Sequence, residues 1–356
     1  MATSNNIFGK YLHDSQEFEA ELERLEALDR ITYVVTKIGG IGDTFASLPV
    51  IRAIQNHWPE SRGWFIVDGG MPLDGLFADE SFDLIEISRG TGITGVYKQY
   101  RDIRKTLPEQ PDIYIDLTQS PRGFYYALFS RAKLKLGFKW HSFHKWVLDA
   151  AVDRSYTKFE GDTFMDVPRM LGIERNLTEP SYQPADHTLE DYKRWKQASN
   201  LGDNENFLLL NPGARTDRKR WSKEKWPELI KLLDRIYDGK YVLLEGPAEK
   251  GITSVIDAKL PDDLSAKVET NVCRPLGEVT HLANDAEGIL TNDTYLLHIG
   301  LTLGAPTFCI FNGKDPFRYR FTAGPHDCCF DLRTSRPDVK MVSTDVRGWL
   351  EDTGII

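Results

Sequence analysis

The chain has 356 residues, 41% of them hydrophobic and 27% charged, which is the composition of a globular protein long enough for two domains. Its formal net charge of −9 argues against a general nucleic-acid-binding protein, which needs a basic face to displace counterions. No run of about 18 apolar residues predicts a transmembrane helix, and Met1 to Lys10 lack the apolar core of a signal peptide. We therefore expect a cytoplasmic protein whose membrane contact is peripheral at most.

The first half of the chain predicts one helix and then an alternation of strands and helices. Residues 12–30 are rich in Glu, Leu and Ala, with apolar residues at helical spacing, and predict an amphipathic helix. From residue 31 onwards, buried-strand patterns alternate with helical ones, which is typical of a parallel, doubly wound sheet. The predicted strands are 31–36, 64–67, 84–87 and 112–117, and the predicted helices are 43–56, 96–107 and 120–130.

A second alternation follows an irregular, aromatic stretch at 138–186 that predicts one helix near 163–171. Pro180 and Pro184 mark a domain boundary within 176–186. Strands are then predicted at 207–210, 241–244, 267–269, 288–290 and 307–311, and helices at 188–198, 223–237, 248–258, 276–284, 294–303 and 344–350. The expected organisation is a helical extension (1–30), two Rossmann-like domains (31–182 and 183–335), and a C-terminal helix (336–356) packing back towards the first domain.

The first chemical motif is KIGGIGDT at 37–44, which follows a strand and opens a helix. Its glycines permit a sharp turn and leave room for a ligand. Asp43 near the helix start is either an N-terminal cap or a general base facing an interdomain cleft. A dinucleotide fingerprint with Asp68 as its ribose-binding acid is a weaker alternative. Phe45 stands where that fingerprint needs its third glycine, and its bulk prevents close helix–strand packing.

A cationic loop, NPGARTDRKRW at 211–221, follows the first strand of the second domain. Such a loop at the carboxyl end of a strand is suited to binding a diphosphate, and its cations can neutralise a leaving group without a metal ion. The alternative is a solvated basic loop. In the next motif, YVLLEGPAEK at 241–250, Glu245 or Glu249 is a candidate to bind ribose hydroxyls. Helix-start capping by Glu249 and structural pairing of Glu245 are equally compatible with the pattern.

The fourth motif, GILTNDTYLLHIG at 288–300, predicts a strand, a polar corner and a helix. The free N–H groups at the start of that helix form an anion site. Asp293 lies at the corner, and Thr294 and His298 share one helix face beside it. A lone helical histidine is usually structural, but this arrangement favours a ligand role. Asn312 to Pro316 end the next strand and can line the same site.

Two basic stretches in the first domain have two interpretations, a solvated face or a surface for an anionic, partly lipidic ligand. One contains Arg101, Arg104 and Lys105. The other interleaves cations with aromatic residues and contains Arg131, Lys133, Lys135, Phe138, Lys139, Trp140, Lys145 and Trp146. The four cysteines, at 273, 309, 328 and 329, form no C-x-x-C pair and predict neither a zinc site nor a disulfide framework.

Taken together and in this order, the four motifs resemble glycosyltransferase family 9, the ADP-heptose:lipopolysaccharide heptosyltransferases, over residues 31–350. The block from Asn292 to Pro316 is similar to the most specific signature of the family. Lys219-x-Trp221 followed by Trp226-Pro227, and Gly42-Asp43 followed by Leu48-Pro49, also match. Tyr295 departs from the family glycine, and it narrows the space beside the donor unless its ring turns away.

The resemblance implies an α/β protein of GT-B fold, with two doubly wound Rossmann-like domains facing across a cleft and an extra N-terminal helix. It implies that Asp43 is the base that deprotonates the acceptor hydroxyl and that Lys219 holds the donor phosphates. The other implied donor-binding residues are Thr216, Glu249, Asp293, Thr294 and His298. Candidates for binding the acceptor are Arg101, Arg104, Lys105, Arg122 and Lys139.

The implied reaction is an inverting transfer of heptose from ADP-L-glycero-D-manno-heptose to the Kdo/heptose inner core of lipopolysaccharide, in a Gram-negative bacterium. It needs neither a cofactor nor a metal. The expected partners are the sugar nucleotide and a lipid A-linked oligosaccharide, with peripheral contact at the cytoplasmic face of the inner membrane and no nucleic acid. The alternatives are a family-9 transferase for another sugar nucleotide, a GT-B-fold sugar-nucleotide epimerase, and a binding protein without turnover.

Overall fold

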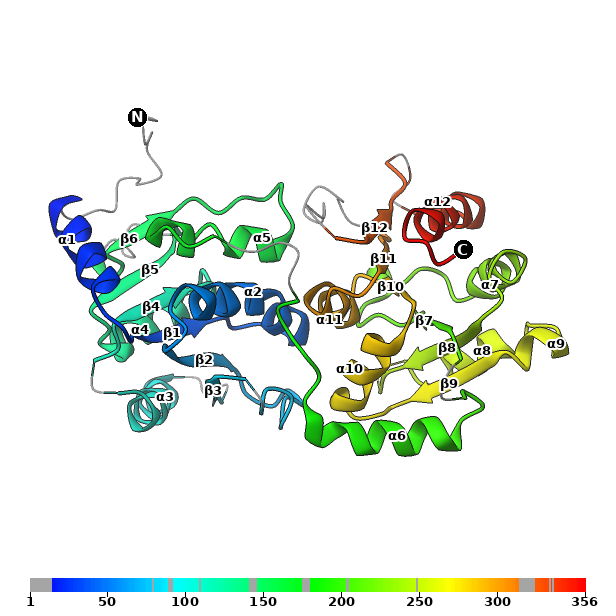
Figure 1. The fold of residues 1–356 in the computed structure, drawn as a ribbon, viewed down its shortest axis with the longest axis horizontal. Coiled ribbons are helices and arrows are strands. Elements are labelled where there is room, and N and C mark those ends of the chain that lie inside the picture. Colours follow the sequence, from blue (N-terminus) through cyan, green and yellow to red (C-terminus); the bar gives the residue numbers. More distant parts are fainter. Residues whose placement is uncertain are drawn as a thin grey trace. The chain divides into compact units, whose positions relative to one another are not determined.

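The computed structural model describes residues 15–78, 80–88, 92–108, 110–140, 146–174, 180–202, 205–247, 249–313, 324–332, 334 and 336–356. The chain divides into two compact units, Met1–Met71 with Asp79–Asn176, and Pro72–Ala78 with Leu177–Ile356. Each unit is built on a six-stranded parallel sheet (Figure 1). Lys145, residues 176–179, residues 314–316 and the part of the predicted first helix before Ser15 lie outside the described residues.

The first unit has the strand order of a Rossmann-like sheet, and its sequence of elements explains which face each helix covers. The elements are α1 (Ser15–Glu26), β1 (Thr32–Thr36), α2 (Ile41–His57), β2 (Arg62–Asp68), β3 (Phe82–Ile87), α3 (Gly92–Thr106), β4 (Ile113–Asp116), α4 (Pro121–Ser130), β5 (Leu134–Phe138), β6 (Ala150–Val152), α5 (Glu160–Phe164) and the 3₁₀ turn η2 (Pro168–Leu171). The strand order is β3-β2-β1-β4-β5-β6. Because the crossovers change direction at β1, α2 packs with α5 on one face and α3 packs with α4 on the other (Figure 1).

The first helix belongs to the first unit. Its apolar side chains Phe18 and Leu25 are 6% and 1% exposed. On its polar side, the Arg24 guanidinium lies 3.3 Å from a carboxylate oxygen of Asp112, directly before β4. The predicted amphipathic helix therefore closes the end of the sheet at which β1 and β4 begin.

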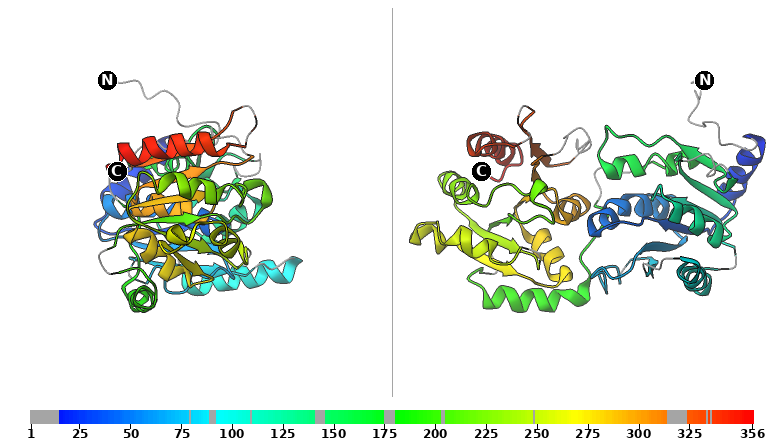
Figure 2. Two further views of the ribbon diagram at one scale, coloured as in Figure 1. Left: turned by 90° about the vertical axis from the view of Figure 1, so that its right-hand side faces the viewer. Right: turned by 180° about the vertical axis from the view of Figure 1, so that it is seen from behind.

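The second unit repeats the same topology. Its elements are η3 (Asp186–Thr188), α6 (Leu189–Ala198), β7 (Phe207–Asn211), η4 (Asp217–Lys219), α7 (Trp226–Leu233), β8 (Lys240–Glu245), α8 (Ile252–Asp257), α9 (Asp262–Ser265), β9 (Val268–Val272), α10 (Leu276–Asp285), β10 (Gly288–Asn292), α11 (Tyr295–Leu303), β11 (Thr307–Ile310), β12 (His326–Cys329) and α12 (Val339–Asp352). The strand order is β12-β11-β10-β7-β8-β9. Helix α10, yellow in Figure 2, contacts both α6 (green) and α11 (orange), and α7 packs with α8 and α12.

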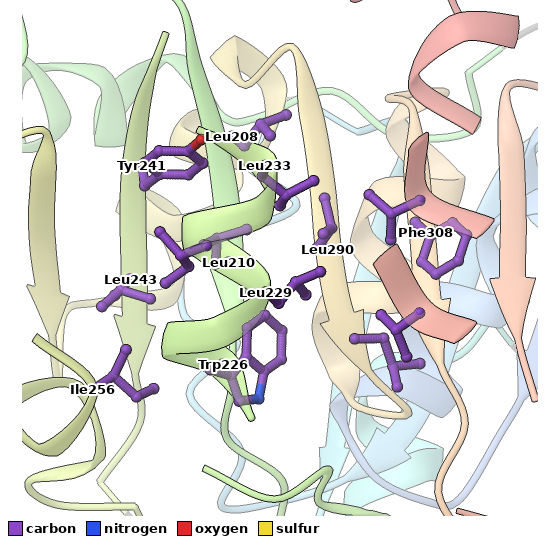
Figure 3. Close-up of a cluster of buried hydrophobic side chains, with 14 of the residues drawn as sticks. Leu208, Leu210, Trp226, Leu229, Leu233, Tyr241, Leu243, Ile256, Leu290 and Phe308 are labelled. Carbon is purple, nitrogen blue, oxygen red and sulfur yellow. The ribbon is translucent and has the colours of Figure 1, made fainter. Parts of the chain in front are cut away.

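The C-terminal helix, α12, packs into the hydrophobic core of the second unit. Trp226 and Leu229 of α7 pack over Leu210 and Leu290 of the sheet (Figure 3). The same cluster includes four side chains of α12, namely Val342, Val346, Trp349 and Leu350. We expected this helix to pack back towards the first domain, but its apolar face is buried within the second unit. The helix also begins earlier than predicted, at Val339, because Asp338 caps it by accepting from Met341 N at 2.8 Å.

A short segment from the first half of the chain, Pro72–Ala78, belongs to the second unit. The Tyr182 hydroxyl donates to the Leu76 carbonyl at 3.2 Å, and the Phe77 and Tyr182 rings meet edge to face at 5.7 Å. The sequence offers no sign of this because the partners are far apart along the chain.

Candidate functional site

Both units have chemical motifs singled out in the sequence at the point where the strand order reverses. In the first sheet this point lies between β1 and β4, and in the second between β7 and β10. Crevices outside the carboxyl ends of such strands are where doubly wound sheets bind ligands. Each unit is described in turn.

Asp43 stands in the first turn of α2, beyond the carboxyl end of β1. One of its carboxylate oxygens accepts from Gly40 N at 2.8 Å, and the other lies 3.1 Å from Lys37 Nζ. A Cβ atom on Gly39 would fall 2.4 Å from the carboxylate, so only glycine permits this folded-back loop. The expected capping role is therefore present. The side chain is also 32% exposed, which leaves it accessible to a substrate proton.

Lys37 is a buried cation to which sequence analysis assigned no role. It is 5% exposed, and its ammonium group lies 3.9 Å from Glu160 and 4.8 Å from the centre of the Phe164 ring. Arg154 also pairs with Glu160. This network fixes the position of Lys37 and, through it, the carboxylate of Asp43. The signal that could have found it is a lysine directly after a fully buried strand.

Asp116, at the end of β4, is a buried acid at this switch point. Burial raises its pKa from 3.8 to about 6, although hydrogen bonds from Thr118 and the nearby Lys37 charge oppose the rise. The Thr118 amide donates to it at 2.8 Å. Above pH 6 the folded protein therefore carries a buried carboxylate that the unfolded chain would solvate.

Asp116→Asn is expected to stabilise the protein above pH 6. The folded pKa exceeds the unfolded one, so wild-type stability falls as pH rises from about 4 to about 6 and is then level, with a total effect on the order of 3 kcal/mol. Asparagine removes the charge and keeps an oxygen that can accept from Thr118. Urea unfolding at a series of pH values should show the variant's advantage appearing across that window. An equal difference at pH 3 and pH 8 would contradict the assignment.

Two of the predicted acceptor-binding cations lie at the carboxyl edge of the first sheet. Arg122 opens α4 and pairs with Asp68, the last residue of β2, at 2.6 Å. Asp68 is thereby engaged in an ion pair rather than standing free as the ribose-binding acid of a dinucleotide site. Lys139 follows β5 and pairs with Asp153 at 2.8 Å.

The other three predicted cations, Arg101, Arg104 and Lys105, lie at the opposite end. They occupy the second half of α3, which runs back towards the beginning of β4. Arg104 donates to the carbonyl of Ser130, the last residue of α4, at 3.3 Å. The structure therefore does not bring this basic stretch together with Asp43.

In the second unit, the structure brings Lys219 and Asp293 together from motifs more than 70 residues apart. The Lys219 ammonium lies 2.8 Å from an Asp293 carboxylate oxygen and donates to the Asp293 carbonyl at 3.4 Å. Asp293 is 5% exposed. Lys219 is the last residue of η4, and Thr216 precedes this turn as its capping residue. The Thr216 carbonyl accepts a hydrogen bond from Lys219 N at 3.0 Å. Thr216 itself is exposed.

Asn292, to which sequence analysis gave no role, holds the cationic loop in place. Its amide group donates to the carbonyls of Pro212 and Gly213, each at 3.0 Å, and its oxygen accepts from Trp221 N at 3.0 Å. Further along, Asn312 donates to the carbonyls of Arg218 and Arg220 at 3.1 and 2.9 Å. Asn292 at the end of β10 and Asn312, two residues beyond β11, thus shape the loop that presents Lys219.

Thr294 caps α11, and its hydroxyl accepts from Leu296 N at 3.3 Å and from the Asn211 amide at 2.9 Å. The first N–H groups of an α-helix have no partner within the helix, so this helix start can bind an anion beside Asp293. His298 lies one turn later and is 8% exposed, inside the unit. The structure thus gives Thr294 a capping role in addition to the predicted donor role.

The two candidate ribose acids have different surroundings. The Glu245 carboxylate accepts from the N–H groups of Gly251 and Thr253 at 2.9 and 3.1 Å. Burial would raise the pKa of Glu245, but these hydrogen bonds and one from the Thr253 hydroxyl hold it below its usual value. Glu245 is therefore a structural cap for α8. Glu249 instead lies against Gly213, where a Cβ atom would fall 2.9 Å from its carboxyl carbon.

Glu249 also borders a cavity of about 450 Å³ at the carboxyl ends of β7 and β8. The lining comes from the cationic loop and the start of α8, with Asp217, Arg220, Trp221, Ser222, Lys223, Glu249, Lys250, Gly251, Ile252 and Val255. Burial raises the pKa of the Tyr295 phenol well above its usual value, and the Glu249 carboxylate adds to the rise. Tyr295, at the position of the family glycine, is thus a neighbour of the same acid.

Comparison with known proteins agrees with this architecture. The model of glycosyltransferase family 9 (heptosyltransferase) matches residues 100–345. The lipopolysaccharide core heptosyltransferase OpsX of Haemophilus influenzae is 23% identical over 292 residues, 80% of each chain. A family 9 glycosyltransferase from Veillonella parvula superposes with a TM-score of 0.76 at 18% identity, covering 90% of this chain and 97% of that one. E. coli ADP-heptose lipopolysaccharide heptosyltransferase II superposes with a TM-score of 0.68 at 15% identity, covering 91% of this chain and 100% of that one.

The two parallel sheets with flanking helices have the GT-B architecture of those structures. The matched family region covers more than half of the chain and includes Lys219, Glu249 and Asp293, the residues gathered at the second switch point. The chain therefore belongs to glycosyltransferase family 9, the heptosyltransferases.

Proposed function

We propose that this glycosyltransferase transfers heptose from ADP-L-glycero-D-manno-heptose to the Kdo/heptose inner core of lipopolysaccharide. The observation that carries the proposal is the pairing of Lys219 with Asp293 at the start of α11, with Glu249 at the neighbouring strand end. Two of the relatives named above are lipopolysaccharide heptosyltransferases by their names. Their similarity supports both the sugar and the acceptor class.

The donor is proposed to bind the second unit. The Lys219 ammonium and the N–H groups that begin α11 would take the diphosphate, since both favour negative charge. Glu249 would accept from the ribose hydroxyls, and the cavity beside it has the size of a nucleoside site. Tyr295 borders the ribose corner and is proposed to influence which donor sugar fits.

The acceptor is proposed to bind the first unit, with Asp43 as its base and Arg122 and Lys139 near its anionic groups. As the acceptor oxygen attacks the anomeric carbon, its proton passes to the Asp43 carboxylate. The bond to the diphosphate breaks, and its electron pair leaves with ADP. Attack opposite the leaving group inverts the anomeric centre. Lys219 would neutralise the charge that develops on the leaving phosphate, a role that needs no metal ion.

Substituting the two acids of the β8 motif should separate binding from stability. Glu249→Gln is expected to raise the donor KM about tenfold, because a ribose hydroxyl would lose a charged acceptor worth about 1.5 kcal/mol. Glu245→Gln should leave KM near the wild-type value and lower the melting temperature, because it weakens the cap of α8. Steady-state kinetics and thermal unfolding of both variants check this. The reverse pattern would transfer the ribose role to Glu245.

A transfer assay in EDTA tests the proposed reaction. Purified protein and a deacylated, Kdo-containing acceptor would be offered ADP-heptose, ADP-mannose or UDP-glucose, with the product analysed by mass spectrometry and NMR. We expect a heptosylated product of inverted anomeric configuration from ADP-heptose alone. A product from another donor would favour the alternative family-9 transferase. Conversion of the nucleotide sugar without acceptor would indicate an epimerase.

The proposed acceptor is linked to lipid A, so the reaction would take place at the cytoplasmic face of the inner membrane. Within the described ranges, no helix is long and apolar enough to cross a bilayer.

A further inference from the structure

An aromatic strip crosses the outer surface of α3 and α4 in the first unit. The rings of Tyr97 and Tyr100 lie 6.5 Å apart, those of Tyr100 and Phe129 5.1 Å, and those of Phe129 and Tyr125 6.2 Å. Tyr97, Tyr125 and Leu128 are 64%, 42% and 53% exposed. Scattered exposed apolar side chains need no explanation, but a continuous group on two adjacent helices indicates an interaction surface.

The two helices that carry this strip also carry cations. Helix α3 carries Lys98, Arg101, Arg104 and Lys105 and a single acid, Asp102. The exposed Arg131 directly follows α4, which contains no acidic residue. The whole chain has a net charge of −9, so this face, named here the α3–α4 face, is a local reversal of the protein's overall sign. Its electrostatic complement is an anionic surface.

The basic part of the α3–α4 face is separate from the proposed catalytic edge. Asp43 and Arg122 lie beyond the carboxyl ends of the strands, whereas Arg101 and Lys105 lie in the half of α3 that leads to the beginning of β4. The transfer chemistry therefore leaves this basic and aromatic cluster without a role.

We propose that the α3–α4 face binds the surface of an anionic lipid bilayer. Tyrosines favour the boundary between hydrocarbon and headgroups, where the ring is buried and the hydroxyl stays hydrated. Leu128 would enter the acyl region, while the long basic side chains would reach headgroup phosphates. A symmetric contact with a second copy would place like charges against each other, which disfavours that occupant.

Co-sedimentation of the full chain with vesicles tests the proposal. We expect binding to vesicles of phosphatidylethanolamine with phosphatidylglycerol, weaker binding as salt is raised, and little binding to pure phosphatidylcholine. The triple variant Tyr97→Ser/Tyr125→Ser/Leu128→Ser should bind more than tenfold more weakly. Arg101→Gln/Lys105→Gln should lose about fivefold for each charge removed.

Matched controls remove equally exposed groups elsewhere, Tyr156 by Tyr156→Ser and two cations by Lys193→Gln/Arg347→Gln. These variants should bind vesicles like the wild type. Thermal unfolding confirms that each variant is folded. Three results would each overturn the proposal. The first is a wild type that does not bind anionic vesicles, the second is a folded triple variant that binds them as well as the wild type, and the third is a loss of binding in the control variants as large as in the test variants. Concentration-dependent dimers that the triple variant abolishes would assign the face to a second copy instead.

The inference does not depend on the identity of the transferred sugar. Turnover of a water-soluble, deacylated acceptor by the triple variant should match that of the wild type, because none of its three residues is proposed to contact the donor or the acceptor. Loss of vesicle binding with intact turnover supports the proposal. If the wild type binds vesicles but transfers no heptose, the proposed function is wrong, but the proposal that the α3–α4 face binds an anionic bilayer still holds.

Discussion

Asp43→Asn is expected to lower kcat by about 10²- to 10⁴-fold, the usual contribution of a general base. The carboxylate is the only group in the first motif able to take a proton from an acceptor hydroxyl. Asparagine keeps its shape and an oxygen for the Gly40 amide, so the start of α2 should persist. The affinity for ADP, measured by calorimetry, should stay unchanged because the donor is proposed to bind the second unit.

The matched control is Asp338→Asn. Asp338 is likewise a carboxylate that accepts a backbone N–H in the first turn of a helix, at 2.8 Å, but it caps α12 outside both switch points. We expect it to cost about 1 kcal/mol of stability and to leave turnover intact. Wild-type turnover by Asp43→Asn would remove Asp43 from the mechanism and leave it only its capping role.

Lys219→Met is expected to lower kcat/KM by about 10²- to 10³-fold, the range seen when a group that stabilises developing negative charge is removed. The loss has two parts, since the substitution removes a cation and leaves the nearly buried Asp293 without the ammonium that lies 2.8 Å away. Affinity for ADP should fall, whereas affinity for adenosine should hold, because the lysine is proposed to contact phosphate.

Two further variants distinguish this role from a general effect of charge. Lys225 lies in the same segment, but its ammonium donates to the Pro337 carbonyl at 2.9 Å, so Lys225→Met should retain donor affinity. The double variant Lys219→Met/Asp293→Asn should recover part of the ADP affinity. It also removes the negative charge of Asp293, which would otherwise repel the diphosphate once Lys219 is gone. Equal losses of adenosine and ADP affinity in Lys219→Met would show that the lysine supports the loop rather than the phosphates.

Most of the fold could be predicted from the sequence because parallel strands are buried on both faces. Runs such as 31–36 and 207–210 are almost wholly apolar, and each was correctly predicted as a strand. Strands β5, β6 and β12 were not predicted, since Leu134–Phe138 contains a lysine and a glycine, Ala150–Val152 is too short and His326–Cys329 is too polar to form such a run. The sequence shows that α12 has an apolar face but does not show that this face packs into the core of the second unit.

The candidate site was predictable where a motif contains its own chemistry, as with Asp43, Lys219 and Asp293. The choice between Glu245 and Glu249 needed the fold, which directs the first carboxylate to the N–H groups of α8. Asn292 was missed because its partners lie about 80 residues earlier.

Lys37 and Asp116 were missed for a related reason, since each follows a different strand and their closeness appears only once β1 pairs with β4. The cations of α3 show the opposite error. Their sequence suits an anionic ligand, but only the direction of the helix reveals that they lie away from Asp43.

The most direct test of the account is the release of ADP from ADP-heptose by purified protein in EDTA, with and without the deacylated Kdo-containing acceptor. The account predicts release that requires the acceptor, proceeds without added metal and disappears in Asp43→Asn. ADP-heptose that binds tightly but is not consumed with the acceptor present would contradict the proposed donor–acceptor pair. Release that stops in EDTA and returns with a divalent cation would contradict the role given to Lys219.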